Sequence, residues 1–215
     1  AEGPGAIVTD ILYEKRFGER HMVEIEVPIG YHDLNNNGDW DLGVGDIKLG
    51  YKHASYHNLA VGRMLSVGVE VKLPTGGEGS GLGKGTAVFE PYVAFAQLLP
   101  GDAFIQLQGF AEIPTKSNFN DEAGFKIAVG KTFTEGEFGR AWSPMIETLV
   151  VHEFGDESET NVDLVPQFQV SLNTRQHILL NIGTRVPLTN AGERDTQIVI
   201  YLLWDWFDGG FFDGW

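Results

Sequence analysis

The chain repeats one pattern of apolar and polar positions, in which the two kinds of residue alternate over a short run that ends with a proline at a turn. The four clearest runs cover residues 23–30, 65–76, 104–116 and 181–190. Because successive side chains of a strand point to opposite faces, each run predicts a strand with one apolar and one polar face. No helical pattern separates the runs. The sequence therefore predicts an all-β fold, an antiparallel up-and-down transmembrane β-barrel of about ten strands.

Ten segments are strand-like, with breakers rich in Gly, Asn, Asp and Pro between them. They are residues 20–30, 45–54, 63–74, 86–97, 102–114, 122–133, 144–154, 161–173, 176–188 and 196–206. The proline endings fall on the first, third, fifth and ninth segments, as expected if alternate strands of a meander end on the same side. We expect residues 1–19 to precede the barrel, residues 20–207 to form it and residues 208–215 to be an aromatic C-terminal tail.

The two predicted faces differ in charge. The candidate lipid face carries none and includes Val23, Ile25, Val27, Ile47, Leu49, Phe125, Ile127, Val129, Leu164, Phe168, Val170, Ile178, Leu180, Ile182, Ile198, Ile200 and Leu202. The opposite face holds a candidate lumen charge network of Glu24, Glu26, Asp46, Lys48, Lys52, Glu70, Lys72, Glu90, Lys126, Asp163 and Arg185. A water-soluble barrel or sandwich would reverse this arrangement, and it remains the alternative because alternation alone does not say which face is outside.

A barrel of this size has a narrow bore, so charged side chains inside it must pair to avoid a large desolvation cost. We expect two sets of its residues to pair with each other: Lys48, Lys52, Lys72, Lys126 and Arg185 on one side, and Glu24, Glu26, Glu70, Glu90 and Asp163 on the other. On one interpretation these pairs only hold the wall together. On the other, small residues such as Gly50, Ser66 and Gly68 leave room for water or a slim solute.

Aromatic residues gather near the C-terminus. Trp and Tyr favour the membrane interface, because an apolar ring with one polar group suits the headgroup layer. A girdle is therefore predicted from Trp204, Trp206, Phe207, Phe211, Phe212 and Trp215, with Tyr31, Trp40 and Trp142 as weaker candidates. In a soluble protein the same cluster would be a core plug or a partner-binding patch.

Charge and composition limit the classes of partner that the chain is expected to bind. Fifteen Lys and Arg face 30 Asp and Glu, a formal net charge of −15, which argues against nucleic acid and makes cations the more natural partners. The chain has no Cys, so thiolate chemistry is excluded. Its longest apolar run, residues 198–204, is far shorter than the roughly 20 residues of a spanning helix. The chain begins with Ala, which we interpret as a mature chain after removal of an export signal.

Residues 33–46, DLNNNGDWDLGVGD, begin like a calcium-binding loop, with Gly38 at the tight turn. The candidate ligands are Asp33, Asn35, Asn37, Asp41 and, through its backbone carbonyl, Asp39. The twelfth position is Val44 instead of the usual Glu, so the alternative is an acidic β-turn. A weak calcium site is the one metal site expected here, and no other cofactor is expected.

Other chemical motifs are missing. The six His have no zinc-protease spacing, and no nucleophile motif occurs. The Gly-rich residues 76–86 lack the spacing of a phosphate loop and are interpreted as a mobile hairpin loop. A barrel enzyme of lipase or protease type would rest on the neighbours His152 and Glu153 alone, so we predict that the protein is not an enzyme.

Two stretches carry a resemblance to a known family. GVGDIKLGYKHA (residues 43–54) and VGVEVKLPTGGEGSGLGKGTAVFEPYVAF (residues 67–95) resemble bacterial outer-membrane proteins of the MetA-pathway of phenol degradation family, often labelled "transporter". The similarity runs from about Glu24 to the aromatic end. It implies a β-barrel in the bacterial outer membrane and passage of small, aromatic or hydrophobic compounds.

The function expected from these features is a channel or transporter for small solutes or cations, with a narrow charged lumen in a lipid bilayer. Acidic residues at the rim would steer the solute: Asp33, Asp39, Asp41, Asp156, Glu157 and Glu159. The alternative is a structural outer-membrane subunit or anchor that presents its loops, or residues 5–21, to another envelope protein without transport.

Overall fold

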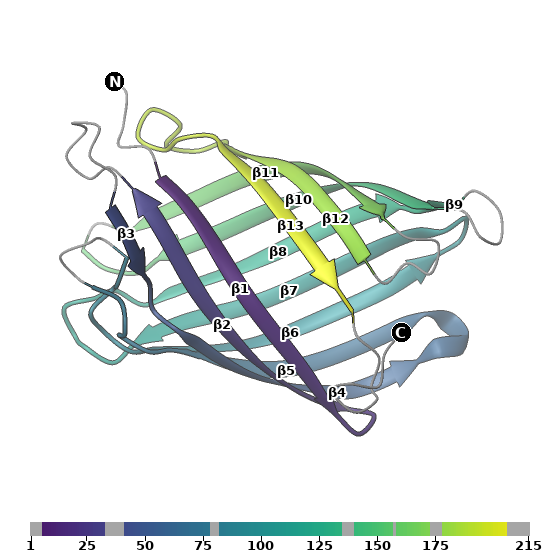
Figure 1. Cartoon of the computed structure of the whole chain (residues 1–215), viewed down its shortest axis with the longest axis horizontal. Coiled ribbons are helices and arrows are strands. Elements are labelled where there is room, and N and C mark those ends of the chain that lie inside the picture. The colour runs from purple at the N-terminus through teal and green to yellow at the C-terminus, as the bar shows by residue number, and fades with distance from the viewer. Residues whose placement is uncertain are drawn as a thin grey trace.

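The computed structural model of the chain is a single antiparallel sheet that curls around a central space (Figure 1). It describes residues 6–32, 41–77, 82–134, 140–156, 158–172 and 178–205. One 3-10 turn, η1 (Leu59–Val61), is the only helical element among them. The strands are β1 (Ala6–Phe17), β2 (His21–His32), β3 (Asp41–Val44), β4 (Lys48–Asn58), β5 (Arg63–Lys72), β6 (Val88–Leu99), β7 (Ala103–Pro114), β8 (Glu122–Lys131), β9 (Phe133–Thr134), β10 (Ala141–Glu153), β11 (Glu159–Ser171), β12 (Ile178–Pro187) and β13 (Gln197–Trp204).

The strands form an up-and-down meander, as the sequence predicts. Along the main path each strand pairs antiparallel with the next, in the order β1-β2-β4-β5-β6-β7-β8-β10-β11-β12-β13, while β3 pairs with β2 and β9 with β10. We call the end of the sheet with the connections 73–87 and 188–196 the loop end, and the end with the tight connections 18–20 and 100–102 the turn end. The four prolines that close alternating runs all lie at the loop end: Pro28, Pro74, Pro114 and Pro187.

The expected number of about ten strands is too low, because the sheet has 13. All ten expected segments are strands, and β1, β3 and β9 are additional. Part of the segment expected to precede the barrel, residues 1–19, forms β1, which pairs with β2 from Ala6↔His32 to Phe17↔His21. Apolar residues occur on both faces of β1, with Val8 and Leu12 on the same face as Glu14, so the alternation that identifies the other strands is weak there.

The sheet is not closed into a barrel. Among the described residues no backbone pairing joins β1 to β13, so these two strands are its edges. Because the main path contains eleven strands, the two edge strands run in the same direction (Figure 1). Tyr201 of β13 interacts electrostatically with Glu14 of β1 and Glu24 of β2, so the curled sheet brings its two edges toward each other.

The distribution of side chains is the reverse of that in a water-soluble barrel. The aliphatic and aromatic rows lie on the outer face, where for example Val67 is 44%, Phe125 is 45% and Ile182 is 48% exposed. The charged rows lie on the inner face, where Glu90 and Asp163 are buried. Only four hydrophobic residues of the described part of the chain are buried: Val88, Ala128, Ala141 and Val165. The sheet thus encloses a polar interior and leaves no large hydrophobic core.

Candidate functional site: the lumen and its loop-end constriction

The inner face of the sheet carries a series of ion pairs between neighbouring strands. On β2 and β4, Glu26 and Lys48 are register partners, and Lys48 Nζ lies 2.6 Å from Glu26 Oε1. Both side chains are largely shielded from solvent, which makes such a pair stronger than one at an open surface. This pair anchors the β2–β4 wall of the lumen.

Lys72 is the centre of a longer ion-pair chain across β5, β6 and β7. Its Nζ lies 3.3 Å from Glu90 Oε2 and 2.7 Å from Glu112 Oε1. Glu112 was not among the expected site residues, although it lies on the polar face of an expected strand. Lys84, from the connection between β5 and β6, extends the chain with its Nζ 3.7 Å from Glu112 Oε2 and 3.3 Å from Glu122 Oε1.

Deeper in the lumen, acidic groups are in excess. Glu24 lies near enough to Glu70 and to Lys52 to interact with both electrostatically. Glu24 also leans over Gly50, where a Cβ would lie 2.6 Å from the Glu24 carboxyl carbon. Lys126 places its Nζ 5.3 Å from the centre of the Phe110 ring, in a cation–π contact.

Asp46, an expected member of the charge network, binds backbone N–H groups. Its Oδ1 accepts from the N–H of Gly76 at 2.9 Å, and its Oδ2 accepts from the N–H of Lys84 at 2.7 Å. These two donors come from opposite arms of the Gly-rich connection between β5 and β6. Leu82 of that connection packs on Gly30, where a Cβ would lie 3.0 Å from Leu82 Cδ1.

The Gly-rich connection joins the paired strands β5 and β6 as a hairpin loop, as the sequence predicts, and hydrogen bonds to Asp46 hold its described arms, residues 73–77 and 82–87. Lys116 Nζ adds a hydrogen bond to the carbonyl of Gly85, and Thr86 is buried. Asp46 lies about 30 residues or more from its partners in the chain, so no local pattern could reveal the contact. We call these two arms and Asp46 the loop-end constriction.

A cavity of about 210 Å³ lies along the inner face nearer the turn end. Small side chains on β5, β6 and β8, which are Ser66, Ala94 and Ala128, make room for it, and Lys52, Gln108 and Lys126 supply polar groups. The expected space beside small lumen residues is therefore found at Ser66. It is wide enough for several water molecules or part of a small solute.

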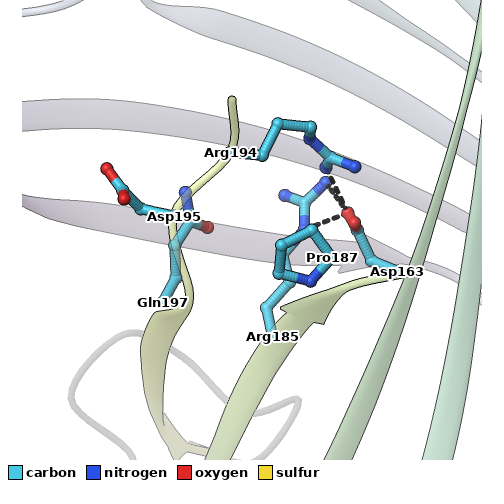
Figure 2. Close-up of a pocket in the computed structure, with 6 residues that line it drawn as sticks. All are labelled: Asp163, Arg185, Pro187, Arg194, Asp195 and Gln197. Atoms are coloured by element: carbon cyan, nitrogen blue, oxygen red, sulfur yellow. Dashed lines mark hydrogen bonds and ion pairs between the residues drawn. The ribbon is translucent and has the colours of Figure 1, made fainter. Parts of the chain in front are cut away.

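Asp163 and Arg185, two further expected residues, lie together at the loop end of the lumen (Figure 2). Arg185 Nε donates to Asp163 Oδ2 at 2.5 Å, and Arg185 Nη2 contacts the same oxygen. Arg194, from the connection between β12 and β13, donates to that oxygen through Nη2 at 2.7 Å. Sequence reasoning missed Arg194, because nothing local places a residue of a connection over the lumen. With Pro187, Asp195 and Gln197 these residues line a pocket of about 300 Å³.

The remaining candidates lie outside this network. Asp33, Asn35, Asn37 and Asp39 are outside the described residues, and only the backbone of Asp41 is described, as the start of β3. The calcium site therefore stays a prediction. No cluster of three or more His, Asp or Glu suited to a metal occurs in the described part of the chain. At the rim, Glu159 accepts from Asn190 Nδ2, Asp156 is exposed, and Glu157 is not described.

The neighbours His152 and Glu153 make separate contacts. His152 Nδ1 lies 2.8 Å from Thr160 Oγ1, and Glu153 accepts from Asn120 Nδ2 at 2.8 Å. Because the two are adjacent on β10, their side chains point to opposite faces of the sheet. They do not form a shared acid–base pair.

Aromatic residues surround the outer face at both ends of the sheet. Of the expected girdle, Trp204 is half exposed on the outer face, while Trp206, Phe207, Phe211, Phe212 and Trp215 lie outside the described residues. The turn end also carries Phe17, Tyr56, Phe133 and Trp142, and the loop end carries Tyr31, Phe89 and Phe154. Several of these residues stand alone in the sequence, so only the register of the strands brings them to a common level.

Within the described segments, no helix has the length and apolarity needed to span a membrane. Compared with models of known protein families and with curated protein sequences, the chain shows no match.

Proposed function

We propose that this chain is a bacterial outer-membrane β-barrel that forms a narrow channel for small solutes. The observation that carries the proposal is the reversed distribution of side chains, with exposed aliphatic rows outside and ion pairs inside. In water the exposed rows would cost roughly 25 cal/mol for each Å² of apolar surface, whereas hydrocarbon removes that cost. The inner ion pairs need no contact with lipid.

The height of the outer apolar band supports this proposal. On β10, Trp142 belongs to the turn-end aromatic residues, and Phe154 directly after the strand belongs to the loop-end ones. Their separation in sequence corresponds to roughly 40 Å along a strand and to roughly 28 Å across a bilayer at a tilt near 45°. The hydrocarbon core of a bilayer is about as thick.

The charges of the lumen favour small polar solutes, and cations among them. Glu14, Glu24, Glu70 and Glu90 all interact electrostatically with Tyr92, so one side of the lumen is acidic. Such a surface concentrates cations and repels anions. At the loop end, the constriction held by Asp46 limits the size of what enters.

Insertion into a membrane requires that the open seam between β1 and β13 be closed, because unpaired backbone groups are costly in hydrocarbon. The two edges run in the same direction, so we propose that they close by parallel pairing. The electrostatic contact of Tyr201 with Glu14 supports this closure.

The test is conductance across a planar bilayer. The purified protein, folded from urea into lipid vesicles and then added to a bilayer, should give discrete conductance steps with a higher permeability for K⁺ than for Cl⁻. Heat-modifiable migration in gels and dependence on detergent are the accompanying signs of a lipid-embedded barrel. A correctly folded protein that stays silent in the bilayer would overturn the channel.

The unpaired edges of β1 and β13 favour a second candidate function, that of a structural outer-membrane subunit or anchor. An edge strand can accept an added strand from another protein through main-chain hydrogen bonds. A silent barrel that co-purifies with one envelope protein, and loses it when Ile11 of β1 is replaced by Pro, would favour the role of anchor. Recovery of conducting protein without any partner would argue against it.

A further inference from the structure

The turn between β1 and β2 is basic, although the chain as a whole is acidic. Residues 15–21, KRFGERH, hold three of the 15 Lys and Arg and only one of the 30 Asp and Glu. Lys15 shares the outer face with Val23, its register partner on β2. Arg20 is exposed in the turn, and its carbonyl accepts from the N–H of Ala54 at 2.8 Å, which fixes the turn against β4. Lys15 and Arg20 therefore lie at one corner of the outer face, at the turn end.

These two cations are unpaired. Neither has an ion-pair partner in the part of the chain that the structure describes, unlike Lys48 and Lys72 in the lumen. Glu19, the one acidic residue of the turn, is exposed and leaves a formal charge of +1 with Lys15 and Arg20. The corner is thus positive in a chain with a formal net charge of −15, and an anion is the partner that it lacks.

Two histidines lie beside the cations. His21 directly follows the turn, and His53 of β4 is its register partner, with the ring centres 4.7 Å apart. Both are on the outer face, because His53 is in turn the register partner of Val67. The Nδ1 atom of His21 lies 2.7 Å from the Tyr51 hydroxyl, which donates to it when the ring proton is on Nε2. The exposed His21 ring then offers Nε2–H as a donor to a ligand. We call Lys15, Arg20, His21 and His53 the basic corner.

The basic corner lies at the level of the turn-end aromatic residues. Phe17 is the register partner of His21, and Tyr56 follows on β4. Aromatic residues at this level mark the headgroup layer of a bilayer. Toward the middle of the sheet, the outer face of β2 and β4 is aliphatic, with Ile25 and Leu49 exposed. A molecule bound here therefore meets cations at one end and hydrocarbon along the rest, which matches the two parts of a phospholipid.

We propose that the basic corner binds an anionic phospholipid. The phosphate group accepts from Lys15, Arg20 and His21, and the acyl chains lie along the aliphatic outer face of β2 and β4. Each basic side chain near an anionic membrane contributes about a five-fold preference for it. The tight turns of such barrels lie on the periplasmic side, so the lipid belongs to the periplasmic leaflet. This inference rests on the proposed insertion into a membrane, and it does not depend on conduction.

The experiment is native mass spectrometry of the folded protein in detergent, with phosphatidylglycerol and phosphatidylcholine of identical acyl chains as probes. Both carry the phosphate, but the choline cation cancels its charge. Phosphatidylglycerol should be retained at least about five-fold more often. Inorganic phosphate, added in excess, tests whether the headgroup chemistry alone suffices, and it should not displace the lipid because it lacks acyl chains. Equal retention of the two lipids, or displacement of phosphatidylglycerol by phosphate, would overturn the proposal.

Substitutions assign the lipid to this corner. Lys15→Gln/Arg20→Gln should lose the preference for phosphatidylglycerol, whereas Glu19→Gln should increase it, which damage to the fold would not do. The matched control is Lys131→Gln/Arg140→Gln, which removes the same charge from exposed residues at the turn end of β8 and β10 and should keep the preference. An unchanged preference in the first variant, or an equal loss in the control, would refute the assignment.

Failure of this site is distinguishable from failure of the proposed function. A protein that enters no vesicle would refute the membrane barrel itself. A silent barrel that retains phosphatidylglycerol would refute only the channel, and a conducting barrel without lipid preference would refute only the basic corner.

Discussion

Gly68 of β5 lies directly under the ring of Tyr92 of β6. The two residues are register partners, and a Cβ on Gly68 would lie 2.6 Å from Tyr92 Cε1 and closer still to the end of the ring. The missing side chain lets the ring lie against the wall of the lumen. A large aromatic residue therefore occupies the inner face without projecting fully into the bore.

Replacing Gly68 by Val should force the Tyr92 ring off the wall and into the lumen. We expect a lower single-channel conductance, and we expect the double variant Gly68→Val/Tyr92→Ala to recover it because the displaced ring is gone. The measurement is planar-bilayer conductance. Gly109→Val is the matched control on the outer face, where the nearest atom to an added Cβ is 3.8 Å away. If Gly68→Val conducts like the parent, Tyr92 does not border the path.

Replacing Asp46 by Ala should release the loop-end constriction. The variant loses the acceptors for the N–H groups of both Gly76 and Lys84, so the arms on either side of the Gly-rich connection should move apart. We expect a larger conductance and faster proteolysis within residues 73–87, with an intermediate effect for Asp46→Asn, which keeps one acceptor oxygen. Glu19→Ala, at an exposed residue of the β1–β2 turn at the other end of the sheet, should change neither. An unaltered conductance for Asp46→Ala would show that these arms do not limit the channel.

Features that depend on residues close together in the chain can be predicted from this sequence, and contacts between distant residues cannot. Alternation in residues 65–73 predicts both the strand β5 and the opposite faces of Val67 and Lys72, because a strand fixes side-chain direction residue by residue. The ion-pair partners of these side chains cannot be predicted in this way. That Lys72 meets Glu112, 40 residues away, depends on the register of two intervening hairpins. The position of Arg194 over Asp163 and the open seam at β1 depend on the curvature of the whole sheet, which no local pattern encodes.

Lys72 stabilises two carboxylates that otherwise face each other. Lys72→Met leaves Glu90 and Glu112 without their shared cation, and we expect it to lower the free energy of unfolding by about 3 kcal/mol, near the lower end for a broken buried pair. The measurement is urea unfolding in detergent, followed by Trp fluorescence. Adding Glu90→Gln and Glu112→Gln should restore part of the loss, because no uncompensated charge remains. A variant as stable as the parent would show that water already screens these groups.

A charge on the outer face should act differently from the same charge in the lumen. Val67→Arg places a guanidinium in the exposed aliphatic row and should cost about 2–4 kcal/mol in a bilayer, or prevent folding into vesicles. Gln106→Arg places it on the inner face of β7, where we expect insertion to continue and the preference for cations to weaken. Folding yield in vesicles, read from heat-modifiable migration, separates the two. Equal yields would contradict the assignment of the outer face to lipid.

The seam between β1 and β13 can be tested with cysteines, because the chain has none of its own. Glu14 and Tyr201 lie on the inner face of the two edge strands and interact electrostatically, so the pair Glu14→Cys/Tyr201→Cys should crosslink within one molecule through a short bis-maleimide once the protein is folded in vesicles. Glu14→Cys/Phe125→Cys, with its second thiol on the outer face of β8, should not. A crosslink that joins two molecules would mean that a second copy fills the seam. No crosslink at all would mean that the edges stay apart in lipid, and parallel closure of the barrel would then be wrong.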